Sequence, residues 1–467
     1  MQTSRHYYGT TTNSTIRKLL MLFPLCLKRK ICFTVLLLVC SIAHAESLSE
    51  IFNLAVQVDT TLQQANDNRL ATMTLLPQAR AGLLPVIDFT ANTTYNNTNN
   101  PQLVRYNTFY YGANLATPLL NLAAWFQYRQ VDDQIKSAVA LYEDAKQDLI
   151  VRVVTQYFTI LKALDDLFFT RSERKAFARQ LEQTKQKFNA GVIAITDVNV
   201  AQARYDNAHA QEISAANALS DQEEIMGQIT GVPAKNINIL KYSINLHRPQ
   251  PDDIDYWVKA SLDQNYEIKS KRYDVAVARK NISIQRAGHY PTIQANGSTN
   301  VSKSVPPAPV VANDNSIGLT FTLPLFNSGK IVSQTTQAKY QFEIARQKEI
   351  ESERNVVSNT RQAYRGILTQ ISQVKALQQS VISNKSALDA TQAAFDVGTR
   401  TIVDVLNAQT DLLRAQSDLA KAKYDYIVES FKLKRYAGLL TVEDVNIVNA
   451  WLVPAPKNTY DVPDIGK

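Results

Sequence analysis

Few residues of this chain stand at spacings that could support catalysis. The best match is Ser172-Glu173-Arg174-Lys175, which fits the Ser-x-x-Lys pattern of enzymes that activate a serine nucleophile. No partner motif accompanies it, and the sequence contains no Gly-x-Gly-x-x-Gly, phosphate-binding P-loop or His-Glu-x-x-His motif. His209, His247 and His289 are far apart in the sequence. The stretch 172–175 therefore indicates a solvated helix surface, and we expect no enzyme activity, cofactor or metal.

A second candidate is a carboxylate at the start of a predicted helix. Thr401-Ile402-Val403-Asp404 forms a capping box, with Asp404 near the positive end of the helix dipole. Asp197 follows a similar pattern, but Ala194 stands where the capping residue should be. Helix capping is one explanation of Asp404, and a functional charge is the other.

Each carboxylate follows a glycine between two long helical segments. Gly398 is the only glycine between positions 366 and 438, so it predicts a turn between helices over about 328–395 and 402–436. Apolar residues recur every seventh position on both sides, a pattern typical of left-handed coiled coils. These residues are Ile367, Val374, Val381, Leu388 and Phe395 before the turn, and Val405, Leu412, Leu419, Tyr426 and Leu433 after it.

The same hairpin pattern occurs twice. A shift of 207 residues places Gly191 on Gly398 and Asp197 on Asp404, and a shift of 206 places Arg80-Ala81-Gly82 on 286–288. We therefore predict two repeats, 46–251 and 252–438, each with a helix, two strands, a long helix, a hairpin turn and a second helix. A C-terminal segment, 439–467, is expected to pack around the helices at mid-height.

Residues 1–45 have the features of an export signal. A basic start is followed by the apolar run 31–39 and by Ala43-His44-Ala45, a cleavage site. Cys26, Cys32 and Cys40 all lie inside it, so the mature chain has no thiol chemistry. Val39 before Cys40 disfavours lipoprotein processing. Without the signal, 44 Lys and Arg face 42 Asp and Glu, so the pI of 9.1 does not indicate nucleic-acid binding.

Four segments alternate apolar and polar residues and are predicted to be strands. They lie at 85–97, 106–117, 292–304 and 316–323, with loops at 96–101 and 305–313. A helix of about 65 residues, 122–188, follows the second strand and would be about 100 Å long. The first helix is expected to run from 47 to about 78. The strands form either a surface sheet or part of a membrane barrel, and four strands cannot close a channel without other chains.

The two turn motifs, Gly191 to Val198 and Gly398 to Leu406, closely resemble those of the TolC family. The resemblance covers essentially the whole mature chain. It implies a mainly α protein with a membrane β part: a homotrimer whose four strands per chain make a twelve-stranded outer-membrane barrel, continued by an α-helical coiled-coil tunnel through the periplasm of a Gram-negative bacterium. It also implies a periplasmic adaptor, also called a membrane-fusion protein, and an inner-membrane pump of the resistance-nodulation-division, ABC or major facilitator type.

The resemblance assigns roles to residues near the turns. Asp404 matches a pore-lining aspartate of the periplasmic entrance, and Asn407 stands where close relatives carry a second aspartate. Arg400 and Asp197 match partners in the network that closes the entrance, with Thr196 beside it. Phe395 stands where the family network has a tyrosine, so the hydrogen bond made by the tyrosine hydroxyl is absent here. The adaptor is expected to dock on the turns at Gly191, Val192, Gly398 and Thr399.

The resulting prediction is a passive outer-membrane exit duct of an efflux pump or type I secretion system. Its partners are outer-membrane lipid, the adaptor and the pump, and not nucleic acid. A structural periplasmic coiled coil without a pore is the main alternative. An enzyme that uses Ser172 and Lys175 is the other alternative.

Overall fold

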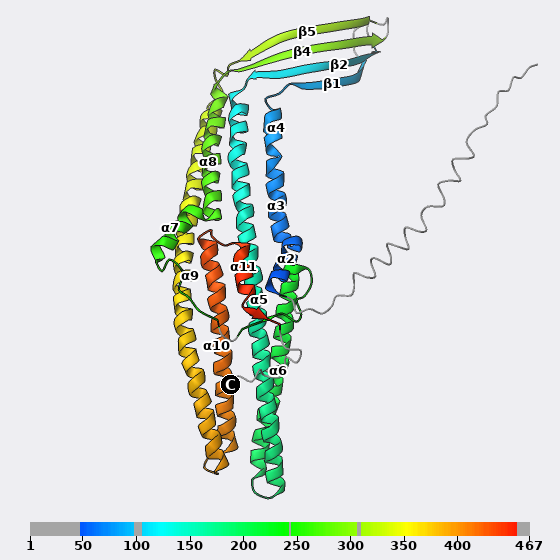
Figure 1. Ribbon diagram of the computed structural model, residues 1–467. Helices are drawn as coiled ribbons and strands as arrows, with labels where there is room; N and C mark the ends of the chain where they lie inside the picture. Colours follow the sequence, from blue (N-terminus) through cyan, green and yellow to red (C-terminus); the bar gives the residue numbers. More distant parts are fainter. Residues whose placement is uncertain (1–46, 98–104, 242–243, 306–309, 455–467) are drawn as a thin grey trace, which may run out of the picture.

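A computed structural model describes residues 47–97, 105–241, 244–305 and 310–454. The predicted signal, 1–45, lies outside these ranges, as does the end of the chain, 455–467. The described chain is elongated, with a sheet at one end and two helix-to-helix turns at the other (Figure 1). The sheet and the turns are therefore separated by the full length of the helices.

Two long helices form most of that length. Helix α5 (Leu122–Asn189) has 68 residues and α9 (Lys330–Asp396) has 67. At 1.5 Å per residue each spans about 100 Å. Helix α6 (Ile195–Thr230) packs along α5, and α10 (Ile402–Tyr436) packs along α9. The predicted helical hairpins are confirmed, and several sevenfold positions are buried, as expected for coiled-coil packing: Ile367, Val374, Val405, Leu419 and Leu433.

The first predicted helix is instead three helices. They are α2 (Leu48–Val58), α3 (Thr60–Met73) and α4 (Leu75–Ala81). The first break is at Asp59, whose Oδ1 accepts a 2.7 Å hydrogen bond from the Leu62 amide and so begins α3 anew. Arg152 of α5 donates to both carboxylate oxygens of Asp59 and fixes this bend.

A matching break occurs in the second half of the chain. Asn265 separates α7 (Ile254–Gln264) from α8 (Tyr266–Arg286), which continues into the short 3-10 helix η1 (Ala287–His289). The Asn265 side chain accepts a 3.1 Å hydrogen bond from the Ile268 amide, as Asp59 does from Leu62. Asp59 and Asn265 are 206 residues apart, the spacing at which the sequence matches itself.

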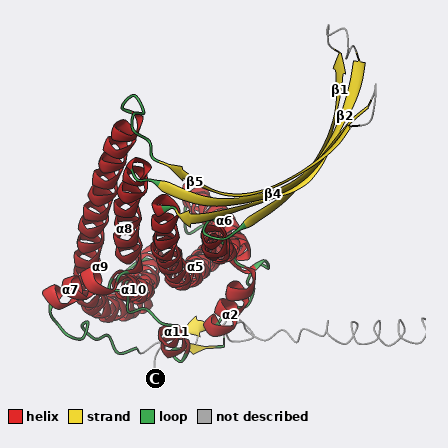
Figure 2. Cartoon of the chain, turned by 90° about the horizontal axis from the view of Figure 1, so that it is seen from above, coloured by secondary structure: helices red, strands yellow, loops and turns green. Residues whose placement is uncertain are grey.

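The sheet joins the two halves of the chain. Its strands are β1 (Val86–Asn97), β2 (Arg105–Leu120), β4 (Thr292–Val305) and β5 (Val310–Thr322). All neighbours are antiparallel in the order β1-β2-β4-β5, so the central pair comes from different halves. The loop predicted at 305–313 is too long, because Val311 already pairs with Lys303. The strands curve strongly (Figure 2).

The main hydrophobic core lies at mid-height. Tyr157 and Phe158 of α5 pack there with Ile367 of α9 and Ile427 of α10. Helix α11 (Val442–Asn449) and a two-stranded sheet of β3 (Ile239–Leu240) and β6 (Leu452–Val453) cover this region (Figure 1). None of the helices in the described ranges is long and apolar enough to cross a membrane.

Candidate functional site

Both turns at the far end from the sheet have the same hydrogen bonds. The amides of Gly398 and Thr399 donate to the carbonyls of Phe395 and Ala394, at 2.9 Å each. Gly191 and Val192 repeat this pattern in the other hairpin. These are Schellman motifs, with glycine in the left-handed region at φ +72° and +77°. We call residues 190–194 and 397–401 the two tips.

Each tip is open around its glycine. A Cβ atom built on Gly191 or Gly398 would meet no described heavy atom within 4 Å. Glycine is therefore required here by the backbone conformation and not by close packing within the chain. Val192 and Val397 are 71% and 74% exposed, so each tip presents one large apolar side chain. The sequence prediction included Val192 but not Val397, whose exposure could not be read from its spacing.

Helix α10 begins with the predicted capping box. The Asp404 amide donates to Thr401 Oγ1 at 3.3 Å, and Asp404 Oδ2 accepts from the Thr401 amide at 3.0 Å and its hydroxyl at 2.8 Å. These hydrogen bonds, and the Arg400 charge, hold the pKa of Asp404 below its usual value. In one protomer Asp404 therefore caps a helix and carries a negative charge at neutral pH.

The resemblance also assigns entrance roles to Thr196, Asp197, Arg400 and Phe395, but the described residues of one chain show no bond between Arg400 and Asp197. Thr196, Asp197 and Arg400 are exposed, and no ion pair links Arg400 to Asp197 within the described residues. Helix α6 has no side-chain cap at Ala194. Phe395 is half-buried and has no hydroxyl to donate. Any contact between Arg400 and Asp197 must therefore involve another chain or another conformation.

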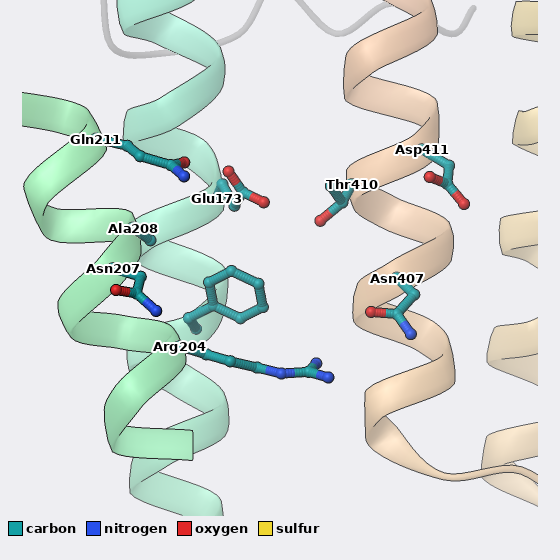
Figure 3. A pocket seen from close by; sticks show the side chains of 9 residues that line it. Glu173, Arg204, Asn207, Ala208, Gln211, Asn407, Thr410 and Asp411 are labelled. Atoms are coloured by element: carbon teal, nitrogen blue, oxygen red, sulfur yellow. The ribbon is translucent and has the colours of Figure 1, made fainter. Parts of the chain in front are cut away.

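Asn407 borders a cleft between the two hairpins. The cleft has a volume of about 450 Å³ and lies between α5 and α6 on one side and α10 on the other (Figure 3). Charged side chains from both sides line it. Sequence patterns did not predict this cleft, because its walls come from segments more than 190 residues apart in the chain. The lining residues are Glu173, Phe177, Arg204, Asn207, Ala208, Gln211, Asn407, Thr410 and Asp411.

The Ser-x-x-Lys stretch lies on α5 beside this cleft. Arg174 within the stretch and Arg171 just before it both bind Glu212 of α6, with Arg171 Nε 2.9 Å from Glu212 Oε1. No group of His, Cys, Asp and Glu in the described ranges could hold a metal ion. This stretch therefore holds α5 and α6 together.

Above the cleft, α5 and α10 are joined by polar contacts. Lys421 pairs with Asp166, and Lys162 pairs with Asp425. Tyr424 donates a 2.9 Å hydrogen bond to Asp165 Oδ2. Burial raises the pKa of the half-buried Asp165 carboxyl to about 6, despite this hydrogen bond.

We expect Asp165→Asn to stabilise the folded protein at pH 8 but not at pH 4. The raised pKa means that the folded state loses stability as the pH rises from about 4 to 6, because its carboxyl resists ionisation. After allowance for solvent exposure, the gain should be on the order of 1 kcal/mol. Thermal unfolding at both pH values measures this gain.

Asp425→Asn is the control and should destabilise the folded protein, since it removes the partner of Lys162. An equal change at both pH values with Asp165→Asn would refute the argument.

The sequence profile of the family described as "Outer membrane efflux protein" matches residues 51–232 and again 257–439. The chain belongs to the outer membrane efflux protein family. It is 35% identical over 430 residues to outer membrane protein TolC of Vibrio cholerae, covering 89% of this chain and 96% of that protein. It is 26% identical to the proteases secretion protein PrtF of Dickeya chrysanthemi, and that match covers 89% of this chain and 93% of PrtF.

Solved structures share the fold. The CmeC outer membrane channel of Campylobacter jejuni matches with a TM-score of 0.73 at 19% identity, covering 87% of this chain and 90% of that chain. The outer membrane protein VceC of Vibrio cholerae matches with a TM-score of 0.70 at 15% identity, and that match covers 84% of this chain and 96% of VceC. As a member of the outer membrane efflux protein family, the protein is an exit duct located in the outer membrane and extending into the periplasm. This is a family of channels and not of enzymes.

Proposed function

We propose that three copies of the chain form one closed duct. The observation that carries this proposal is the curved sheet, which has unpaired edges at β1 and β5 (Figure 2). Unpaired backbone groups are not tolerated in lipid, so a membrane sheet must close on itself. Three copies that pair β5 of one with β1 of the next would give a twelve-stranded barrel.

The two faces of the sheet differ in polarity. The register places Ile87, Leu115 and Ile317 on one face, and all three are exposed. Phe89, Leu319 and Phe321 follow them at alternate positions on the same face. One residue along, Asp88, Asn114, Ser298 and Ser316 lie across the other face. An apolar face toward lipid and a polar face toward a channel account for this pattern.

The helices would continue the barrel as a periplasmic tunnel built from two repeats. The repeats 46–251 and 252–438 are supported by the two matches of the family profile and by the equivalent breaks at Asp59 and Asn265. In the C-terminal segment, 439–467, the described part 439–454 would encircle the tunnel at mid-height, where α11 packs on the core, and the remainder lies outside the described residues.

The tips would form the periplasmic entrance and the adaptor site. An adaptor would bind at Gly191, Val192, Gly398 and Thr399, and an inner-membrane pump would deliver the substrate. In the trimer, Asp404 would form a ring of three carboxylates, with Asn407, Arg400, Asp197, Thr196 and Phe395 around it. The relatives include a TolC and a protease secretion protein, so small molecules and secreted proteins are both proposed as cargo. We assign no catalytic residue and no cofactor.

Disulfide cross-linking tests the closed barrel. The chain after residue 45 has no cysteine, so Asn92→Cys on β1 can be combined with single cysteines at each position of 311–321 on β5. Because side chains alternate across a strand, we expect covalent trimers at one or two β5 positions of the same parity. They are detected on a non-reducing gel.

The control pairs Asn92→Cys with Gln222→Cys on α6, far from the sheet, which should give no covalent trimer (Figure 1). If no β5 position cross-links, and the detergent-purified protein is monomeric on a sizing column, the duct proposal is wrong.

A further inference from the structure

Basic residues gather where the helices meet the sheet. Four chain segments converge there: 75–87, 117–131, 275–291 and 323–342 (Figure 1). Together they contain seven lysines and arginines and no aspartate or glutamate, although the whole mature chain is nearly balanced in charge. We call these seven residues the basic collar: Arg80, Arg129, Arg279, Lys280, Arg286, Lys330 and Lys339.

Contacts within the chain account for only two members of the collar. Lys280 Nζ lies 2.7 Å from Asp133 Oδ2, and Arg279 lies over the Phe342 ring. The side chains of the other five are exposed and form no ion pair with a described residue. Five cations near this end of the helices therefore have no ion-pair partner among the described residues.

Helix dipoles do not explain the collar. Arg80 and Arg286 lie in the last turns of α4 and α8, where a cation is favourable. Lys330, however, opens α9, where the dipole disfavours a cation. A partner outside the helix is needed to explain why a lysine stands at this position.

Trimer formation would not neutralise the collar either. Rotational symmetry places equivalent residues of three copies at the same level. Each neighbour would therefore bring its own four segments, which contain cations and no acids. Four of the five acids that directly flank these segments are already paired within the chain: Asp132 with Lys136, Asp133 with Lys280, Asp274 with Lys271 and Glu343 with Arg346. Asp88 on β1 is the fifth, and one carboxylate per chain cannot balance five cations.

Apolar side chains lie next to the collar on the strand side. Leu325 and Phe326, just after β5, are 89% and 85% exposed. Leu84, Leu119 and Tyr290, at the ends of the neighbouring strands, are also exposed. The order of apolar side chains followed by cations matches the order of hydrocarbon followed by phosphate in a lipid leaflet.

We propose that the basic collar binds the headgroups of anionic phospholipids in the periplasmic leaflet of the outer membrane. This inference rests on the proposed barrel, which would place the collar at that leaflet. Arginine donates paired hydrogen bonds to phosphate, and lysine supplies a point charge. Anionic lipid would then fix the depth of the barrel in the membrane.

The test measures which lipid the purified trimer retains. The full-length trimer is reconstituted in an equal mixture of phosphatidylcholine and phosphatidylglycerol, extracted mildly, and its bound lipid is quantified by mass spectrometry. We expect roughly tenfold enrichment of phosphatidylglycerol, which should weaken as salt is raised. The variant Arg80→Gln/Arg286→Gln/Lys330→Gln should lose most of this enrichment.

The matched control removes three exposed cations of α9 outside the collar, Arg354→Gln/Arg365→Gln/Lys375→Gln, and should keep the enrichment. A trimeric collar variant with undiminished enrichment, or wild-type trimer with none, would overturn the lipid proposal and leave the duct proposal standing. A wild-type protein that is monomeric on a sizing column would overturn both.

Discussion

Replacing Gly398 with tryptophan is expected to abolish export while the trimer stays intact. The left-handed conformation costs a non-glycine residue about 1–2 kcal/mol, which a fold of this size tolerates. The indole would project into open space, because a Cβ at Gly398 meets no described atom within 4 Å. A partner that docks closely on this tip would meet the ring directly.

The loss of export should be large. A bulky side chain at the centre of the adaptor interface would keep the two surfaces apart, and its cost in binding free energy should be similar to that of removing a hot-spot residue. A cost of about 2 kcal/mol or more would weaken adaptor docking by roughly thirtyfold. Export is measured as the drug resistance of a strain whose only duct is the variant, and trimer content is measured in its membranes.

Gly398→Asn is the matched control. Asparagine tolerates the left-handed region and adds little bulk, so export should persist. The corresponding Gly191→Trp tests the other tip, whose backbone has the same conformation. Normal resistance with Gly398→Trp would show that the adaptor does not dock at this tip.

The second prediction concerns the charge of the entrance. Asn407→Asp should make reconstituted channels at least about tenfold more sensitive to block by trivalent cations from the periplasmic side. In the proposed trimer, the wild-type entrance has one ring of three carboxylates at Asp404, so it should prefer cations but bind trivalent ions weakly. The substitution adds a second ring one turn along α10.

The charge at Asp404 must be separated from its capping role. Asp404→Asn keeps an acceptor for the Thr401 amide but removes the charge, so it should lower cation preference while α10 still begins at Ile402. Asp404→Ala removes both the charge and the cap, so it should also lower cation preference and in addition destabilise the start of α10. Single-channel recording in a planar bilayer measures selectivity and block.

The cleft supplies a further control for Asn407. Gln211→Glu adds the same charge to the opposite wall of that cleft. If Asn407 acts through the pore, Gln211→Glu should leave trivalent block unchanged. If both variants change block equally, or neither does, position 407 faces only the cleft and the entrance assignment carried over from the family is incorrect.

Features that depend on local repetition could be predicted from the amino-acid sequence. The sevenfold apolar spacing predicted both helical hairpins, because coiled-coil packing buries the same face of a helix at every second turn. Gly191 and Gly398 marked the tips, since only glycine adopts the left-handed conformation there without strain. The capping box at Thr401 and the four alternating strands were equally local, and the structure contains all of them.

Contacts between residues far apart in the sequence could be seen only in the folded chain. Asp59 caps α3 through a local hydrogen bond, but the carboxylate is also held by Arg152, 93 residues away, and the sequence near Asp59 does not predict that contact. The β2–β4 pairing, the cleft at Asn407 and the basic collar each combine segments from both halves of the chain. Periodicity fixes which face of an element is apolar, but the partner of that face depends on how the elements pack in space.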